Sequence, residues 1–289
     1  MAAIVVRRLG RAAMSDVPIR STAFADAWIQ VDRTEDPAFF IGLLDATRAG
    51  LLERARRSPS DFFAALDLQP GHRVLDVGCG TGDFLRLVAP LVSPGDAVGV
   101  DLSETMIDEA RGRQRGGAGN VSFQLGDAEL LAFEDSSFDR VLATQVFLHL
   151  PKPPVALGEI ARVLAPGGLL SISEVDWNTI SLQSTDRQLA RRFTALACDE
   201  LRNGLIARAL PSMLRELGFT KIDVRPEIAI SWQPDAFHKW FVEPSMGHFV
   251  RTGGFTTDEA EWFLRDLEEL AAQGRYFSAR TTYTITAAY

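Results

Sequence analysis

The chain has 289 residues, of which 46% are hydrophobic and 24% charged, and its formal net charge at pH 7 is -8. This length and composition suit one α/β domain with insertions, and no apolar run approaches the roughly 20 residues of a membrane-spanning helix. The negative net charge argues against a nucleic-acid partner, because phosphate contacts need clustered Lys and Arg side chains.

The few cysteines and histidines exclude two kinds of site. Cys79 and Cys198 lie far apart, and the four histidines lack the spacing of metal ligands. We therefore predict no disulfide framework and no metal site. The first residues do not resemble a signal peptide, because the apolar run before their arginines is very short. We expect a cytoplasmic protein, with a homodimer as one option for its assembly.

The N-terminal part of the chain is expected to lie outside the repeating core. Residues 1–20 offer no core-forming pattern and are predicted to be a disordered extension, with Met14 as an alternative start. Residues 21–70 are predicted to form a helical cover. Its aromatic side chains either pack or line a pocket, and we predict that Phe24 and Trp28 contact a substrate.

Short β-rich runs alternate with helical patterns from residue 73 onward. Strands separated by helices of this length are βαβ units, which form a parallel sheet with helices on both faces. The expected strands are 73–78, 97–103, 121–127, 138–147 and 167–177, and the expected helices are 81–92, 104–114 and 153–166.

Beyond residue 177 the alternation loosens. No low-complexity linker separates a second domain, so residues 71–289 are predicted to be one domain with helical insertions at about 177–205 and 235–274. Within this region we expect helices at 183–203 and 210–219 and strands at 221–232 and 280–289.

The sequence GCGTGD at residues 78–83 follows the first predicted strand and suits a ligand loop. It has no lysine, which excludes a P-loop, and Asp83 stands where a dinucleotide fingerprint needs its third glycine. A carboxylate there would repel a pyrophosphate, whereas a ligand with a sulfonium, an ammonium and a nucleoside fits an acidic loop. Asp76 either reaches that ammonium through water or braces the loop.

Two more acidic residues stand at the ends of the next strands. Asp101 follows Gly82 by 19 residues and could accept both hydroxyls of a ribose. Asp127 could accept a proton from the amino group of adenine, and Ala128 could offer its backbone N–H. Each acid alone could be a helix cap. Their positions at successive strand ends favour a nucleoside site.

These motifs resemble class I S-adenosylmethionine-dependent methyltransferases, in particular the ubiquinone and menaquinone biosynthesis group and its small-molecule relatives. The resemblance rests on VLDVGCGTGD, VGVDLSETMI, GDAELLAFEDSSFD and EIARVLAPGGLLSISE, which cover about residues 74–174. It implies a Rossmann-like fold: a doubly wound, mostly parallel seven-stranded sheet whose last strand, near the C-terminus, is antiparallel and lies beside 221–231.

The resemblance also assigns a cofactor, S-adenosyl-L-methionine, which leaves as S-adenosyl-L-homocysteine. It implies that the glycine loop lines the methionine part, Asp101 holds the ribose, Leu102 or Met106 packs on adenine, and Asp127 and Ala128 contact the adenine edge. Cys79 is then a small side chain of the motif and not a nucleophile. The residues predicted to bind the cofactor are Asp76, Gly78, Cys79, Gly80, Gly82, Asp101, Leu102, Met106, Asp127, Ala128 and Thr144.

Methyl transfer from a sulfonium is an in-line displacement, so the protein must mainly orient an acceptor and exclude water. We expect Thr144, Gln145 and His149 beside the methyl group. The resemblance further implies that three residues at the end of the fifth strand surround the acceptor, namely Glu174, Asp176 and Trp177.

These residues also have structural alternatives. His149 is either a general base or a packing residue, Glu174 and Asp176 either take part in the reaction or brace the cover, and Trp177 lies in the pocket or the core.

The predicted acceptor is a small hydrophobic or aromatic metabolite, methylated on O, N or C. Two alternatives remain open: a methyltransferase-like protein that catalyses another reaction, such as a cyclisation, and a nicotinamide-dependent oxidoreductase.

Overall fold

A seven-stranded sheet with the order β3-β2-β1-β4-β5-β7-β6 forms the centre of the computed structural model, which describes residues 24–114 and 119–289. Neighbours from β3 to β5 pair in parallel, whereas β7 is antiparallel to both β5 and β6. The predicted fold, with the C-terminal strand inserted beside 221–231, is thereby confirmed. The strands are β1 Val74–Val77, β2 Ala97–Asp101, β3 Val121–Leu125, β4 Phe138–Thr144, β5 Leu164–Leu182, β6 Thr220–Ser231 and β7 Ser278–Ala288.

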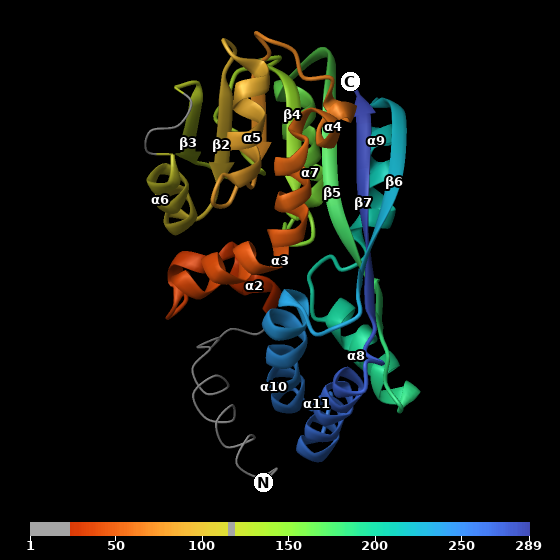
Figure 1. Ribbon diagram of the computed structural model, residues 1–289. Helices are drawn as coiled ribbons and strands as arrows, with labels where there is room; N and C mark the ends of the chain where they lie inside the picture. The colour runs from red at the N-terminus through yellow and green to blue at the C-terminus, as the bar shows by residue number, and fades with distance from the viewer. Residues whose placement is uncertain (1–23, 115–118) are drawn as a thin grey trace.

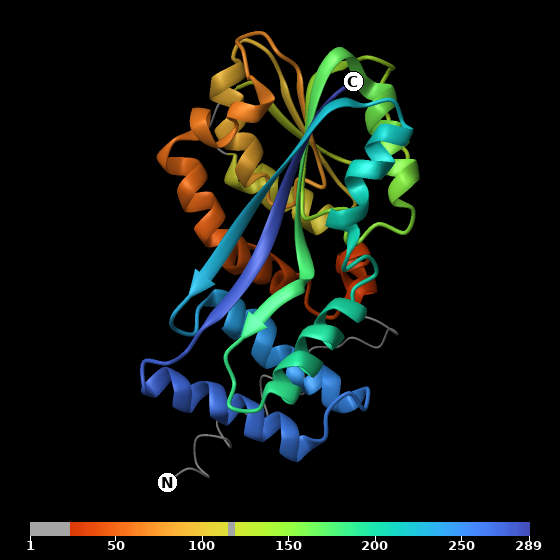
Figure 2. The same cartoon turned by 90° about the vertical axis from the view of Figure 1, so that its right-hand side faces the viewer.

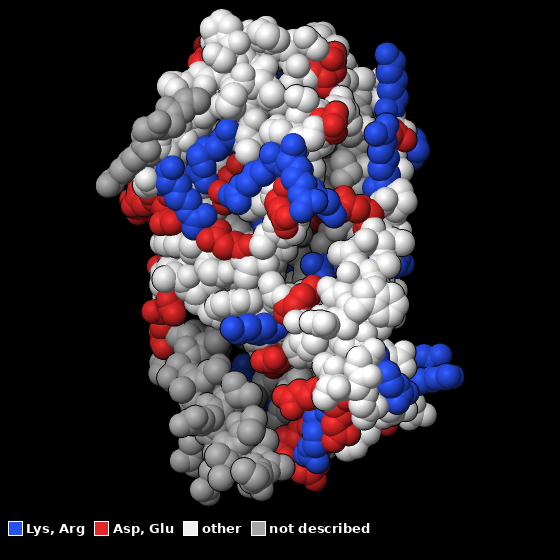
Figure 3. Space-filling view, in the orientation of Figure 1, with Lys and Arg blue, Asp and Glu red and all other residues white. Residues whose placement is uncertain are grey.

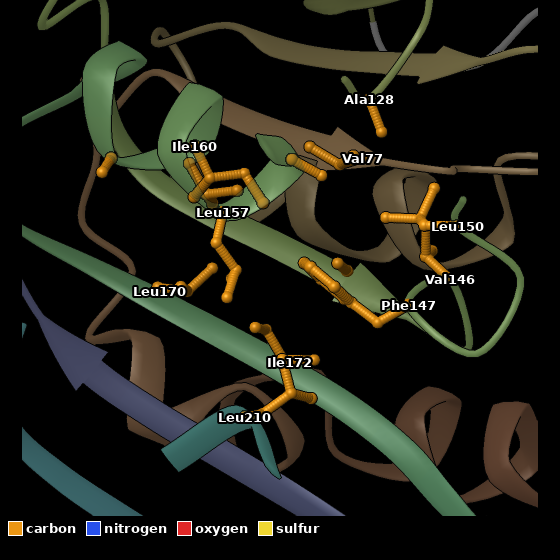
Figure 4. Close-up of a cluster of buried hydrophobic side chains, with 14 of the residues drawn as sticks. Val77, Ala128, Val146, Phe147, Leu150, Leu157, Ile160, Leu170, Ile172 and Leu210 are labelled. Carbon is orange, nitrogen blue, oxygen red and sulfur yellow. The ribbon is translucent and has the colours of Figure 1, made fainter. Parts of the chain in front are cut away.

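Helices cover both faces of this sheet (Figure 1, Figure 2). On one face α7 and α9 pack on β1, β4 and β5, and Figure 4 shows Leu157 and Ile160 of α7 meeting Leu170 and Ile172 of β5. On the other face α3, α4 and α5 pack on the sheet. The helices are α2 Phe24–Ile29, α3 Pro37–Arg57, α4 Pro59–Phe62, α5 Asp83–Val92, α6 Glu104–Arg113, α7 Pro153–Val163, α8 Arg187–Asp199, α9 Ile206–Glu216, α10 Glu243–Arg251 and α11 Thr257–Ala272.

A second hydrophobic cluster lies below the sheet, where β5 and β7 continue into a helical body made of α8, α10 and α11 (Figure 1). Residues 177–182 were expected to begin a helical insertion, but they are strand. Ser181 and Leu182 pair with the first residues of β7, and Ile180 and Leu182 bury their side chains in the second cluster. The insertion becomes helical only at Arg187.

The connections that carry α6, α8 and α11 begin with capped helix ends. Ser103 caps α6, Asp186 caps α8, and Thr256 with Glu259 forms a capping box at α11. Such caps satisfy backbone N–H groups that have no partner within the helix. They fix where each helix starts. The cap of α6 comes just after the end of β2, so it also fixes where α6 begins relative to that strand.

The surface of α3, α5 and α6 carries mixed charge. Basic and acidic side chains alternate across the upper half of the face in Figure 3. Arg113 pairs with Asp45 at 2.7 Å and Arg86 pairs with Asp83 at 2.6 Å. Within the described ranges no helix is long and apolar enough to cross a membrane, and no group of acidic, His and Cys side chains is arranged like a metal site. The predictions for residues 1–20 and Met14 lie outside the described residues.

Candidate functional site

A cleft opens at the carboxyl ends of β1, β2 and β4, between the sheet and the helical body. This is where parallel α/β sheets bind ligands. The predicted site residues that line this cleft are Trp28, Gly78, Gly80, Asp101, Leu102, Met106, Asp127, Ala128, Gln145, His149 and Trp177.

The first two loop glycines permit a close approach to the cleft. Gly78 and Gly80 have φ values of +68° and +53°, which side-chain-bearing residues rarely adopt. A Cβ on Gly78 would stand 2.5 Å from Val146 Cγ2. Gly82, by contrast, caps α5 outside the cleft lining and abuts the Phe123 ring. Its predicted contact with the cofactor stays a prediction, while its contact with Phe123 indicates a packing role.

Asp101 braces the loop and still faces the cleft. Its Oδ2 accepts a hydrogen bond from Gly80 N at 2.8 Å and its Oδ1 accepts one from Ser103 N at 3.0 Å. A carboxylate offers about four lone-pair positions, so capacity remains for two ligand hydroxyls. Burial raises the pKa of Asp101, while its two backbone hydrogen bonds oppose that rise.

Beyond Asp101 the cleft has a flat apolar floor with polar groups at its edge. The Leu102 side chain is 49% exposed although it is apolar, and Met106 is buried next to it. Asp127 Oδ1 accepts a hydrogen bond from Glu129 N at 2.8 Å, and Ala128 is buried beside it. An exposed leucine between two carboxylates fits a planar base that carries a sugar and an amino group.

Arg48 is a functional candidate that the sequence analysis missed. It comes from α3, is 7% exposed and lines the cleft beside Gly80. Its Nη2 donates to the Thr144 carbonyl at 2.5 Å, and its Nε makes a longer contact of 3.5 Å with Gln145 Oε1. Burial lowers the pKa of Arg48, which the negative charges of Asp76 and Asp101 oppose.

The sequence feature that could have identified Arg48 is its position in a helical repeat of apolar residues. Phe40, Leu44, Arg48 and Leu52 recur every four residues, and all four are buried on one side of α3. A cation in an otherwise apolar helical stripe is costly to bury unless it meets polar groups, so the pattern indicates a site.

His149 lies in the middle of the cleft, with its ring centroid 5.2 Å from that of Trp28. Its Nδ1 is buried and has no hydrogen-bond partner among the described residues. Burial lowers the pKa of His149 to about 3, and the positive charges of Arg48 and Arg202 act in the same direction. The imidazole is therefore neutral at physiological pH.

The far end of the cleft is aromatic. Trp177 lies 4.7 Å from Phe241 between ring centroids, and Phe237 and Phe241 stack at 5.1 Å. Trp177 Nε1 is buried without a hydrogen-bond partner in the part of the chain that the structure describes. Arg280 of β7 completes this wall. Sequence reasoning found Trp177 and missed the other three, because they come from the residues just before α10 and from β7, far along the chain.

Two predicted catalytic carboxyls lie outside the cleft lining and are held by the scaffold. Glu174 is fully buried, and its Oε1 accepts hydrogen bonds from Val146 N at 2.8 Å and Phe147 N at 2.7 Å. Asp176 is 1% exposed and accepts two hydrogen bonds from Arg208. These contacts favour the alternative role of both residues as braces, and their expected placement around the acceptor stays a prediction.

Other predicted residues support the site from behind it. Asp76 is buried under the loop, and burial raises its pKa to about 7 against the opposing charge of Arg48. The Cys79 thiol is buried, and burial raises its pKa well above the usual range. Thr144 contributes its carbonyl to Arg48. Phe24 begins α2, and its side chain lies outside the described part of the chain.

The carboxylate of Asp83, at the end of the glycine loop, is paired with arginine side chains. It accepts a hydrogen bond from Arg86 Nη2 at 2.6 Å and pairs with Arg113 at 3.2 Å, away from the cleft. The sequence argument that Asp83 repels a pyrophosphate is corrected accordingly. Among the carboxyl groups whose charges act on Arg48 beside the loop, Asp76 and Asp101 have the largest effect, and Glu174 and Asp83 follow.

The fold, the glycine loop and the strand-end acids together define a class I S-adenosylmethionine-dependent methyltransferase, and the chain belongs to that family. Residues 68–242 match the family model described as a methyltransferase domain. S-adenosylmethionine is the methyl donor in this family. The membership confirms the resemblance found in the sequence and favours methyl transfer over nicotinamide-dependent oxidation.

Particular relatives extend over different parts of the chain. An uncharacterised 37.1 kDa protein of transposon TN4556 from Streptomyces fradiae is 34% identical over 81% of this chain and 68% of its own length. The demethylmenaquinone methyltransferase of Symbiobacterium thermophilum is 40% identical over 42% of this chain, and the match spans 48% of that protein. The solved structure of the 4+2 cyclase SpnF is 26% identical, covers 78% of this chain and 77% of that chain, and has a TM-score of 0.50.

Proposed function

We propose that this protein transfers the methyl group of S-adenosylmethionine to a small hydrophobic or aromatic metabolite. The proposal rests on one observation, namely that the two ends of a single cleft differ in the chemistry of their side chains. Asp101 and Asp127 lie at the nucleoside-like end, and Trp177, Phe237 and Phe241 line the other. An apolar pocket with a few convergent polar groups is typical of small-molecule sites.

The residues present fit the cofactor. Asp101 has free acceptor capacity for the ribose hydroxyls, Leu102 and Met106 offer an apolar surface to adenine, and Asp127 can accept an amino proton. Arg48 is a buried cation beside the glycine loop, so it is suited to the carboxylate of the methionine part. When bound, S-adenosylmethionine supplies an electrophilic methyl group on a positively charged sulfur.

His149 is proposed to orient the acceptor and not to deprotonate it. A pKa of about 3 makes its imidazole a weak base at neutral pH, although the neutral ring can still make a hydrogen bond. Its unpartnered Nδ1 is available to an acceptor hydroxyl or amine, and the Trp28 ring packs beside it. In-line transfer needs an acceptor held in position, and these side chains can supply that contact.

A cyclisation is the second candidate. It is favoured by the likeness to the 4+2 cyclase SpnF and by the weak basicity of His149, because a pericyclic ring closure needs a shaped apolar pocket and no strong base. The two candidates differ in the mass of the product: methyl transfer adds one methyl group, and cyclisation leaves the mass unchanged.

Calorimetric titration with S-adenosylmethionine tests the proposal. Asp101→Asn is expected to weaken binding about 10–100-fold, since it removes charge-assisted acceptors for the ribose. Asp108→Asn is the matched control, because this exposed carboxylate on α6 lies outside the cleft lining and, among the described residues, pairs with Arg111 alone at 3.5 Å. Failure of the wild-type protein to bind S-adenosylmethionine would remove the proposal. Mass spectrometry of reactions with hydrophobic acceptors then separates methyl transfer from cyclisation.

A further inference from the structure

Arg280 places a cation at the aromatic end of the cleft. It lies on β7, and its guanidinium carbon is 4.4 Å from the centre of the Phe237 ring. The side chain is partly buried and belongs to the same lining as Trp177 and Phe241. A guanidinium over an aromatic face is held in orientation by the cation–π attraction, while its edge stays available.

The guanidinium of Arg280 makes no hydrogen bond or ion pair with any residue of the described ranges. The charge of Asp235 acts on Arg280, but the Asp235 carboxylate accepts hydrogen bonds from the Ser231 hydroxyl at 2.5 Å and from His238 N at 3.1 Å, and it makes no ion pair with Arg280. The other cleft arginine differs, because Arg48 donates to a carbonyl and lies among carboxyl groups. All five donors of Arg280 are therefore available to a ligand.

The strand holds Arg280 in place. Arg280 pairs with Ala229 of β6, whereas the pairing of β7 with β5 is interrupted between Asp176 and Ser181. The next residue is fixed by a hydrogen bond from Thr281 N to the Thr179 hydroxyl at 2.9 Å. The interruption of the ladder lies directly beside Trp177, so the cation and the indole N–H belong to one irregular stretch of the sheet.

We propose that the acceptor substrate is a planar hydrophobic molecule with a carboxylate, which pairs with Arg280. The proposal rests on the proposed function and names its substrate class. A carboxylate matches the guanidinium fork with two parallel hydrogen bonds. A single negative charge suits this place better than a phosphate dianion, because Asp235 already puts a negative charge near Arg280 and a second charge on the ligand would be desolvated without a partner. The unpartnered Trp177 Nε1 offers a further donor on the same wall.

Binding of 2-naphthoate and of neutral 2-naphthamide to the protein saturated with S-adenosylhomocysteine tests this proposal by calorimetry. The wild-type protein is expected to bind the acid at least about 10-fold more tightly than the amide. Arg280→Met keeps an apolar stem over Phe237 and is expected to abolish that preference, and Arg280→Lys to keep part of it. Arg225→Met is the control, because it removes an equal charge from the exposed face of β6.

Three outcomes would overturn the proposal. They are equal affinities for acid and amide, no binding of naphthoate at millimolar concentration, and an acid preference that survives in Arg280→Met. Arg280→Met is also expected to leave the affinity for S-adenosylmethionine unchanged; an equal loss there would show that Arg280 serves the cofactor carboxylate instead. If S-adenosylhomocysteine itself fails to bind, the proposed function fails, and naphthoate binding to the free protein then tests Arg280 separately.

Discussion

Replacing Glu174 by Gln distinguishes a carboxyl that braces the cleft from one that takes part in the reaction. Oε1 of Glu174 accepts two backbone hydrogen bonds, and Oε2 has no partner among the described residues. Burial raises the pKa of Glu174 to about 8, with the two hydrogen bonds and the charge of Arg48 opposing that rise. At pH 7 the group is therefore mainly a neutral carboxylic acid, which an amide resembles in shape.

The expected magnitudes follow from those two hydrogen bonds. Glu174→Gln keeps both but replaces one unpartnered O–H of the neutral acid by two unpartnered N–H donors, so it should lower the free energy of unfolding by about 1–3 kcal/mol at pH 7. Glu174→Ala leaves Val146 N–H and Phe147 N–H buried without an acceptor. At about 1–3 kcal/mol for each orphaned donor, the alanine variant should lose about 2–6 kcal/mol.

The pH dependence gives a second readout. The folded-state pKa of Glu174 lies above its ordinary value of 4.5, so the folded protein binds more protons than the unfolded chain between pH 4.5 and about 8. Its contribution is fully present below pH 4.5 and is lost as the pH rises through 8, with a slope of up to about 1.4 kcal/mol per pH unit. The Gln variant lacks this slope and should gain on the wild-type protein as the pH rises.

Urea unfolding at pH 5.5 and pH 8.5, together with methyl-transfer rates, measures these effects. A loss of more than about 3 kcal/mol in Glu174→Gln at pH 7 would contradict the hydrogen-bond reasoning. A variant that folds and binds S-adenosylmethionine normally, but has lost methyl transfer, would return Glu174 to the catalytic role that the sequence suggested.

Three further changes probe the cofactor end and the centre of the cleft. Gly78→Ala should lower both stability and cofactor affinity, since it adds about 1–2 kcal/mol of backbone strain at positive φ and a close contact with Val146. Thermal unfolding measures the loss of stability, and calorimetry measures the loss of affinity. Adding Val146→Ala should restore only the part of the loss that comes from the contact. Arg48→Met should weaken S-adenosylmethionine binding about 10–100-fold, and unchanged calorimetric affinity would exclude its role with the carboxylate. Because the pKa of His149 is lowered to about 3, the rate of methyl transfer should show no His149 inflection between pH 6 and 9; an inflection lost in His149→Gln would contradict this.

The sheet and the nucleoside-like end were predictable because local sequence determines them. The loop glycines, Asp101 and Asp127 stand at the ends of short strands whose pattern is visible within one βαβ unit. Any parallel sheet brings such strand ends to one edge. The sequence did not reveal which of these residues face the ligand. Gly82 and Asp83 follow Gly80 closely in sequence, but they lie at the turn that begins α5, and this turn directs them toward Phe123 and Arg86.

The acceptor end was unpredictable for a different reason, namely that it is assembled from distant segments. Trp177 is on the extension of β5, Phe237 and Phe241 precede α10, and Arg280 pairs within β7, about 100 residues after Trp177. The extension of β5 exists only because β7 pairs with it, so a local reading of residues 177–182 favours a loop or helix. The proposed contact between Arg280 and a substrate carboxylate depends on that late pairing, because a register shift of one residue in β7 would turn Arg280 to the other face of the sheet.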